Sequence, residues 1–161
     1  MKPLVVLVTV FGLLAVGSLL LAGHPNYVVA GTGAMAAMLL FTGAAHFAFT
    51  RGMMQMLPPF VPARQALVLL TGGLEIAAAG GLLLPSFRTA TAWLLLGFFL
   101  LILPANIYAA RHRLNYQTGT FDGPGPAYLW LRIPLQLLFM AWTWYFALYL
   151  PLLASLNTAT P

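Results

Sequence analysis

Five polar side chains that could do chemistry lie within otherwise apolar stretches of this sequence: Glu75, His46, Asn106, Arg132 and Gln136. Glu75 is one of only two acidic residues in the chain and lies about midway along its apolar segment. A carboxyl group at that depth of a bilayer is costly, so it normally faces protein and has a partner. Glu75 is therefore the leading candidate for a functional residue.

These five residues can be interpreted in two ways. In the first, they form hydrogen bonds between helices and hold a bundle together, each bond contributing on the order of 1 kcal/mol. In the second, they line a polar pocket that binds the head of an amphipathic molecule such as a quinone. Glu75 and His46 would then donate, accept or relay protons. The sequence alone leaves both interpretations open.

The residue types available to a metal or a cofactor are few. The chain has no cysteine, which excludes disulfides, thiolate metal sites and CxxC redox chemistry. His46 is the only histidine inside an apolar segment, because His24 and His112 lie at segment boundaries. No two histidines lie at metal-ligand spacing on one helix, and a haem would need a well-placed axial ligand. We therefore predict no metal and no firm cofactor, with a quinone as the candidate ligand.

The surrounding sequence predicts an all-α integral membrane bundle. It is 61% hydrophobic and only 6% charged, whereas a soluble domain carries roughly a quarter charged residues. Its apolar segments are continuous and approach the roughly 20 residues that cross a bilayer as a helix, unlike the short alternating strands of a barrel. We expect a single membrane domain over residues 1–161. Its five transmembrane helices are expected at about 4–22, 28–50, 65–84, 90–110 and 128–153.

The basic residues predict how the bundle is oriented. Lys2 precedes the first apolar run, as in a signal peptide, but the end of that run lacks the usual small residue at −3, so we expect a retained helix. With the N-terminus in the cytoplasm and the C-terminus outside, Arg88 is the only basic residue on the outer side, which satisfies the positive-inside rule. Anionic lipid headgroups are then the expected partners of the basic residues. A nucleic-acid partner is not expected, because these residues are scattered rather than clustered.

Small residues mark the faces on which the third helix is expected to pack. One set repeats every four positions: Gly73, Ala77 and Gly81. A second set, Gly72 and Ala79, shares a face with Glu75. Small residues at this spacing let neighbouring helices approach closely, so we expect tight packing on both faces.

Several short motifs occur in order between about residues 43 and 136. They are Ala44-Ala45-His46-Phe47, Leu57-Pro58-Pro59-Phe60-Val61-Pro62, Gly72-Gly73-Leu74-Glu75, Pro104-Ala105-Asn106-Ile107-Tyr108 and Arg132-Ile133-Pro134-Leu135-Gln136. The ordered set resembles the DoxX family of small bacterial integral membrane proteins. The resemblance implies a four-helix core, here with an added N-terminal helix at about 4–22. It also implies the bacterial cytoplasmic (inner) membrane and a link to membrane redox or quinone-associated systems.

On this resemblance, the leading hypothesis is an accessory or quinone- or lipid-binding subunit of a membrane redox complex. Its expected partners are membrane lipids and other membrane subunits or a second copy of the chain. One alternative is an intramembrane enzyme acting on a quinone or lipid-like substrate, with Glu75 as acid/base and His46 as its partner. Another is a small proton-linked transporter, although the chain shows no internal repeat of the kind that transporters often have.

Overall fold

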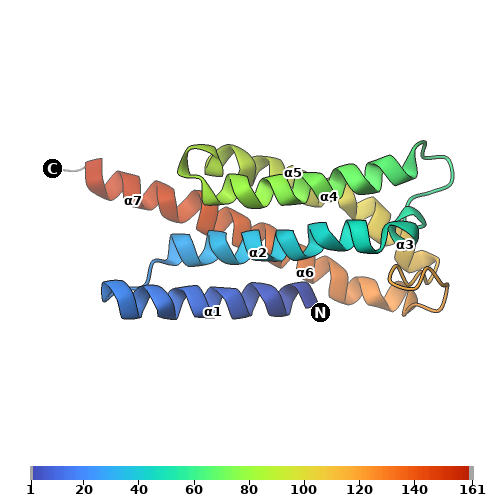
Figure 1. Ribbon diagram of the computed structural model, residues 1–161, viewed down its shortest axis with the longest axis horizontal. Coiled ribbons are helices and arrows are strands. Elements are labelled where there is room, and N and C mark those ends of the chain that lie inside the picture. The colour runs from blue at the N-terminus through green and yellow to red at the C-terminus, as the bar shows by residue number, and fades with distance from the viewer. Residues whose placement is uncertain (1, 160–161) are drawn as a thin grey trace.

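The continuous apolar runs fold as helices, which satisfy their own backbone hydrogen bonds as the interior of a bilayer requires. The computed structural model describes residues 2–159 and contains no strand within them (Figure 1). Five helices are long and apolar enough to cross a membrane, which confirms the predicted all-α bundle. Four of the five are uninterrupted: α1 (Lys2–Ala22), α2 (Tyr27–Ala48), α4 (Arg64–Leu83) and α5 (Pro85–Arg111).

The fifth span is built from several consecutive helical elements and runs from Gly125 to Leu156. In chain order they are the 3₁₀ turn η1 (Gly125–Tyr128), α6 (Leu129–Trp144), the π-helical turn η2 (Tyr145–Tyr149) and α7 (Leu150–Ala159). A short helix, α3 (Thr50–Met54), follows α2 at the end of the bundle where α4 begins (Figure 1).

The helix boundaries lie close to those expected, with one instructive difference. The helix α5 begins at Pro85 rather than near residue 90, and only Leu84, in an extended conformation, separates it from α4. Proline is favoured at the first position of a helix because its fixed φ suits the helix and its missing N–H is not needed there. The proline therefore makes the turn between α4 and α5 shorter than hydropathy alone indicates.

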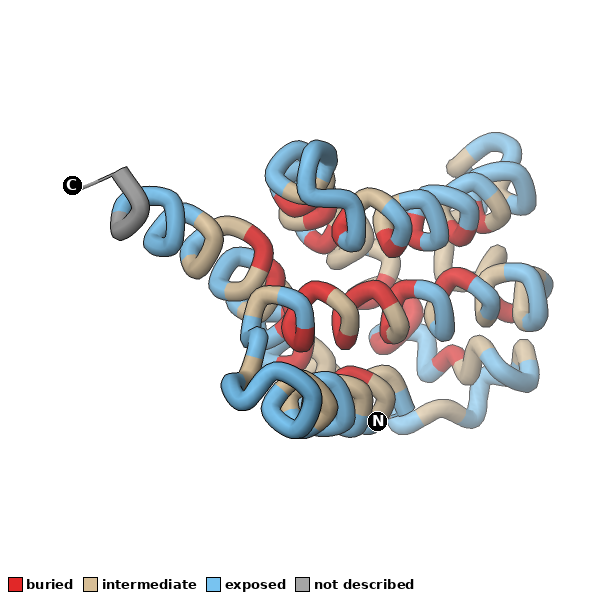
Figure 2. Tube along the Cα trace, turned by 60° about the vertical axis from the view of Figure 1, so that its left-hand side comes forward, coloured by how far each residue is buried: buried red, intermediate tan, exposed pale blue. Residues whose placement is uncertain are grey.

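The core of the bundle surrounds α2, which packs against α1 on one side and α4 on the other. Its most deeply buried large side chains are less than 2% exposed: Leu7, Met35, Met38, Leu39 and Leu82. The outward faces of the helices are exposed (Figure 2). These faces are also apolar, with Leu21 92% and Leu94 76% exposed. Apolar exposure on this scale is expected of a surface covered by lipid.

The two small-residue sets on α4 have different environments. Gly72 and Ala79 are buried on the same face as Glu75, as expected. Gly73 and Ala77 are exposed and show no close packing, whereas Gly81 lies close to α5, where an added Cβ would collide with the Oγ1 of Thr91. Only one face of a helix can pack against its main neighbour. Because Glu75 is polar and costly to expose to lipid, the face that carries it is the one that is buried.

Candidate functional site

The helices α2 and α4 approach closely at two glycines. A Cβ atom added at Gly72 would lie 2.6 Å from the Cβ of His46 and 3.1 Å from the carbonyl oxygen of Gly43. A Cβ at Gly43 would lie 3.0 Å from the carbonyl oxygen of Gly72. Real Cβ atoms rarely come so close to other atoms, so only glycine fits here without displacement. This approach brings His46 on α2 against the buried face of α4.

The imidazole of His46 contacts three groups on α4. Its Nδ1 lies 3.0 Å from the carbonyl oxygen of Val68 and 3.2 Å from the Oγ1 of Thr71. Its Nε2 lies 3.5 Å from the Oε1 of Glu75. The ring is therefore held at one nitrogen by the backbone and hydroxyl of α4, and its other nitrogen faces the carboxyl group.

The second carboxyl oxygen of Glu75 has no hydrogen-bond partner. Its Oε2 is fully buried, and no described residue donates to it or accepts from it. The Glu75 side chain as a whole is only 7% exposed. Leaving a buried polar atom unpaired costs roughly 1–3 kcal/mol, and such atoms in native structures call for an explanation.

A second polar group lies between α5 and α6. The Nδ2 of Asn106 donates to the Oε1 of Gln136 at 3.4 Å, and an Nη of Arg132 donates to the Oδ1 of Asn106 at 3.3 Å. The Nε2 of Gln136 donates to the carbonyl oxygen of Phe99. Both amides are buried, and every polar atom of their side chains that lies fully out of solvent has a partner.

Each amide in this second group stands two residues after a proline within a helix. Pro104 precedes Asn106 on α5, and Pro134 precedes Gln136 on α6. A proline inside a helix removes one backbone hydrogen bond and disturbs the preceding turn. Neighbouring polar side chains can stabilise such a disturbed turn, and Gln136 donates to the carbonyl of Phe99, five residues before Pro104.

The five predicted residues thus form two groups rather than one. His46 and Glu75 pair between α2 and α4, whereas Asn106, Arg132 and Gln136 form a chain between α5 and α6. Within residues 2–159, no hydrogen bond or ion pair joins one group to the other. Whether either group binds a ligand stays a prediction.

An open groove lies at the α3 end of the bundle, and neither His46 nor Glu75 lines it. Its walls include Thr50, one helical turn beyond His46 along the chain, and Gln65, one turn before Val68 on α4. The hydroxyl of Thr50 also donates to the carbonyl oxygen of His46 at 2.7 Å. The His46 side chain is 18% exposed, more than twice the value for Glu75. His46 is therefore the accessible member of the pair and Glu75 the buried one.

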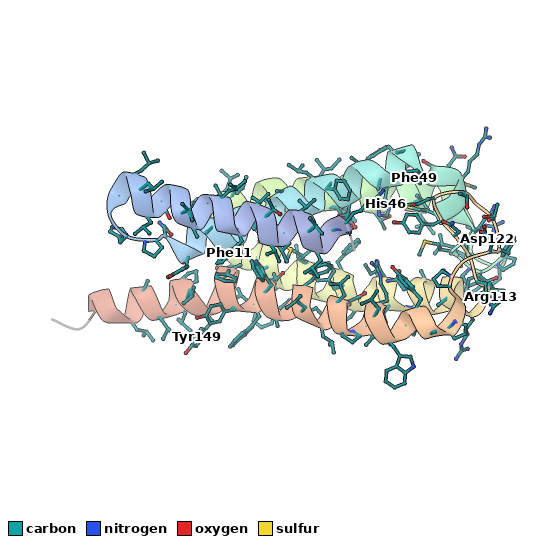
Figure 3. All side chains as sticks on the ribbon, turned by 90° about the horizontal axis from the view of Figure 1, so that it is seen from below. Phe11, His46, Phe49, Arg113, Asp122 and Tyr149 are labelled. Atoms are coloured by element: carbon teal, nitrogen blue, oxygen red, sulfur yellow. The ribbon has the colours of Figure 1, made fainter. Side chains whose placement is uncertain are left out.

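The same end of the molecule carries charged connections. Figure 3 shows His46 and Phe49 toward the end at which Arg113 and Asp122 lie, with Tyr149 toward the other end. A side chain at Gly52 would collide with the carbonyl group of Tyr116, so the α5–η1 connection lies directly against α3. This contact forms one side of the groove.

Sequence reasoning missed three groups that position these side chains. Thr71 lies four residues before Glu75, and this helical spacing is a signal that could have identified it. The other two are the backbone carbonyl groups of Val68 and Phe99. No residue type indicates that a particular backbone carbonyl will accept a side-chain hydrogen bond, so the sequence held no signal for these two carbonyl groups.

Comparison with protein families assigns the chain to one family. Residues 35–147 match the model of a family described as Domain of unknown function (DUF8561). The chain belongs to the DUF8561 family. The matched region is more than half of the chain and contains all five predicted polar residues. No curated protein and no solved structure matches it significantly.

The resemblance to the DoxX family is therefore wrong. The family model that matches is DUF8561, and no DoxX model does. The motifs behind the resemblance combine small residues, prolines and single polar residues. Any helical membrane protein that packs closely and bends its helices uses these residue types. The link to redox complexes loses its basis with that resemblance.

Proposed function

We propose that this chain is a membrane-embedded binding protein that holds the polar head of a small amphipathic molecule at the His46–Glu75 pair. The molecule is lipid-like or quinone-like, and the protein acts as a binding or accessory subunit. The observation that carries the proposal is the buried, unpartnered Oε2 of Glu75. A ligand atom that paired with it would remove the cost of an unsatisfied buried oxygen.

The groove supports this proposal as the route of entry. Its volume of about 830 Å³ is within the range of small-molecule sites, roughly 300–1,000 Å³. Its walls combine apolar and polar side chains, as an amphipathic ligand requires: Phe47, Phe49 and Met54 on the one hand, and Thr50, Gln55, Gln65, Gln117 and Thr118 on the other. A head that passed Thr50 and Gln65 would meet His46 first and Glu75 second.

A binding role suits the residues better than catalysis. Within the described chain, the groups that contact the His46 ring besides Glu75 are a backbone carbonyl and the hydroxyl of Thr71. Neither group titrates at ordinary pH. The chemistry available at the pair is hydrogen bonding and the exchange of a single proton.

The basic residues support a location in a bacterial cytoplasmic membrane with the N-terminus inside. Arg51 lines the groove, and Arg64 begins α4 at the same end of the bundle. By the positive-inside rule, these arginines favour a cytoplasmic location for this end. The ligand would then reach the pair from the cytoplasmic side of the membrane.

Gentle extraction from native membranes followed by mass spectrometry tests the proposal. We expect an amphipathic small molecule to co-purify with the wild-type protein and to be lost from Glu75→Leu. Asn106→Leu is the matched control, because it removes a buried polar side chain from the other group and should retain the molecule. Identical small-molecule profiles for all three proteins would exclude binding at Glu75. The same samples report any protein subunits that co-purify.

A further inference from the structure

The hydrogen on the His46 ring is fixed by its backbone contact. A carbonyl oxygen only accepts hydrogen bonds, so the Nδ1 that lies 3.0 Å from the Val68 carbonyl must carry the hydrogen. The hydroxyl of Thr71 donates to backbone carbonyls of its own helix and leaves its lone pairs toward the same Nδ1. The Nε2 therefore faces Glu75 either as a bare acceptor or, when the ring is doubly protonated, as a second donor.

Three arrangements keep this buried pair electrically neutral. The one with the proton on Oε2 sets two bare acceptors, Oε1 and Nε2, against each other across 3.5 Å, so the two arrangements that place a hydrogen between those atoms are favoured. In one of these two, Glu75 is protonated on Oε1, which faces the bare Nε2 across 3.5 Å. In the other, the proton lies on Nε2 and Glu75 is a carboxylate. A net charge in this apolar interior would be far more costly than either. In both arrangements Oε2 carries no hydrogen, so it can only accept a hydrogen bond.

We infer that the pair selects ligands by hydrogen-bond polarity and takes a hydroxyl-headed amphipath, such as a long-chain alcohol, a phenol or a quinol. This inference rests on the proposed function and narrows its ligand class: among quinone-like molecules it favours the reduced quinol over the oxidised quinone. A hydroxyl group donates to Oε2 and satisfies the buried oxygen. A carbonyl head, as in a quinone, brings a second acceptor against the first and leaves both unpaired.

The neutrality of the pair also argues against a cationic head. An ammonium group would meet no net negative charge there and would lose its hydration on entering an apolar interior. The hydroxyl is the donor that enters with the smallest loss of solvation. Sites built around such a buried hydrogen bond discriminate strongly against analogues that lack the donor.

Two probes that differ only in the donor test the inference: 4-decylphenol and its methyl ether, 4-decylanisole. Each is titrated into the full-length protein in lipid nanodiscs, and bound ligand is quantified by native mass spectrometry. We expect the wild-type protein to bind the phenol at least about tenfold more tightly than the ether, as the loss of one buried hydrogen bond implies.

Two variants at Glu75 test whether the site selects a hydrogen-bond donor. In Glu75→Gln, the amide NH₂ donates to Nε2 of His46 and the amide oxygen takes the place of Oε2, so the preference for phenol should persist. In Glu75→Leu, no acceptor remains and the preference should disappear. Circular dichroism of each variant checks that its helices are retained, and the wild-type comparison stands without either variant.

The outcomes separate the inference from the proposed function. If the wild-type protein bound phenol and ether equally and Glu75→Leu bound neither, the inferred selection for a hydrogen-bond donor would be wrong and the binding site would stand. Tighter binding of the ether, or a loss of preference in a folded Glu75→Gln protein, would also overturn the polarity. Binding of neither probe, or binding that Glu75→Leu leaves unchanged, would overturn both proposals.

Discussion

The bundle contains two buried polar groups that differ in how well their atoms are satisfied. Between α5 and α6, the side chains of Asn106 and Gln136 bond to each other, to Arg132 and to a backbone carbonyl. Between α2 and α4, Glu75 has one oxygen near His46 and one oxygen that no described residue pairs with. The groove at the α3 end is lined by chain neighbours of the α2–α4 group, among them Phe47 and Thr50, and by no member of either group.

This difference separates the two interpretations that the sequence left open. The α5–α6 group has the completeness expected of hydrogen bonds that hold helices together. The α2–α4 group violates the general rule that buried polar atoms are paired. Such violations concentrate at functional sites, where stability is given up for activity. Each interpretation therefore describes one of the two groups.

The largest effect is expected in cysteine labelling, which tests from which side of the membrane the α2–α4 group is reached. Because the chain has no cysteine, single cysteines report on position without interference. In intact cells, Gln55→Cys beside the groove should resist a membrane-impermeant thiol reagent, and His24→Cys at the opposite end should react fully. Both residues are exposed, and both variants should react once the membrane is permeabilised. The reverse pattern in intact cells would place the groove outside.

A substitution at the α2–α4 contact should have the next largest effect. Gly72→Ala places a Cβ atom 2.6 Å from that of His46, so the helices must separate. We expect the free energy of unfolding in mixed micelles to fall by about 2 kcal/mol. Gly73→Ala is the control, because its Cβ meets no atom within 4 Å and alanine favours the helix by up to about 1 kcal/mol. Equal effects of the two substitutions would contradict the close approach of α2 and α4.

Removal of one member of the satisfied group should have a smaller effect. Gln136→Leu leaves Asn106 with an unpaired amide donor, and we expect the free energy of unfolding to fall by about 1 kcal/mol. The same unfolding measurement checks this value, with Leu137→Met on the exposed face of α6 as a control. No change in Gln136→Leu would mean that these hydrogen bonds do not hold α5 to α6.

The smallest effect on stability is expected at Glu75. Glu75→Leu removes Oε2, which is already unpaired, and Oε1, whose 3.5 Å contact with Nε2 of His46 is longer than an ordinary hydrogen bond. Unfolding without ligand should therefore change by less than about 0.5 kcal/mol or become less favourable. Ligand binding should be lost in the same variant. A destabilisation as large as that of Gln136→Leu would instead make Glu75 a structural residue and remove the contrast between the two groups.

The sequence identified the polar residues more reliably than their arrangement. Glu75 and Gln136 were found because a polar residue in an apolar span is costly and must face inward. The division into two groups was not predictable, because His46 and Glu75 lie 29 positions apart and the Asn106–Gln136 pair 30 apart. Spacing within one helix defines a shared face, but it carries no information about which helix that face meets.

What the sequence determined by itself is the set of spans. Apolar length, the prolines at helix starts and the interruption of hydropathy are local properties, and a bilayer leaves an apolar chain little choice other than the helix. What only the tertiary structure decided is the rotation of each helix about its own axis. The set of Gly73, Ala77 and Gly81 repeats at helical spacing, yet α4 buries the face of Gly72 and Glu75, and only Gly81 of the set packs closely, against Thr91 of α5. That choice depends on the fit of Gly72 against Gly43 and His46, a contact between distant segments that no local pattern contains.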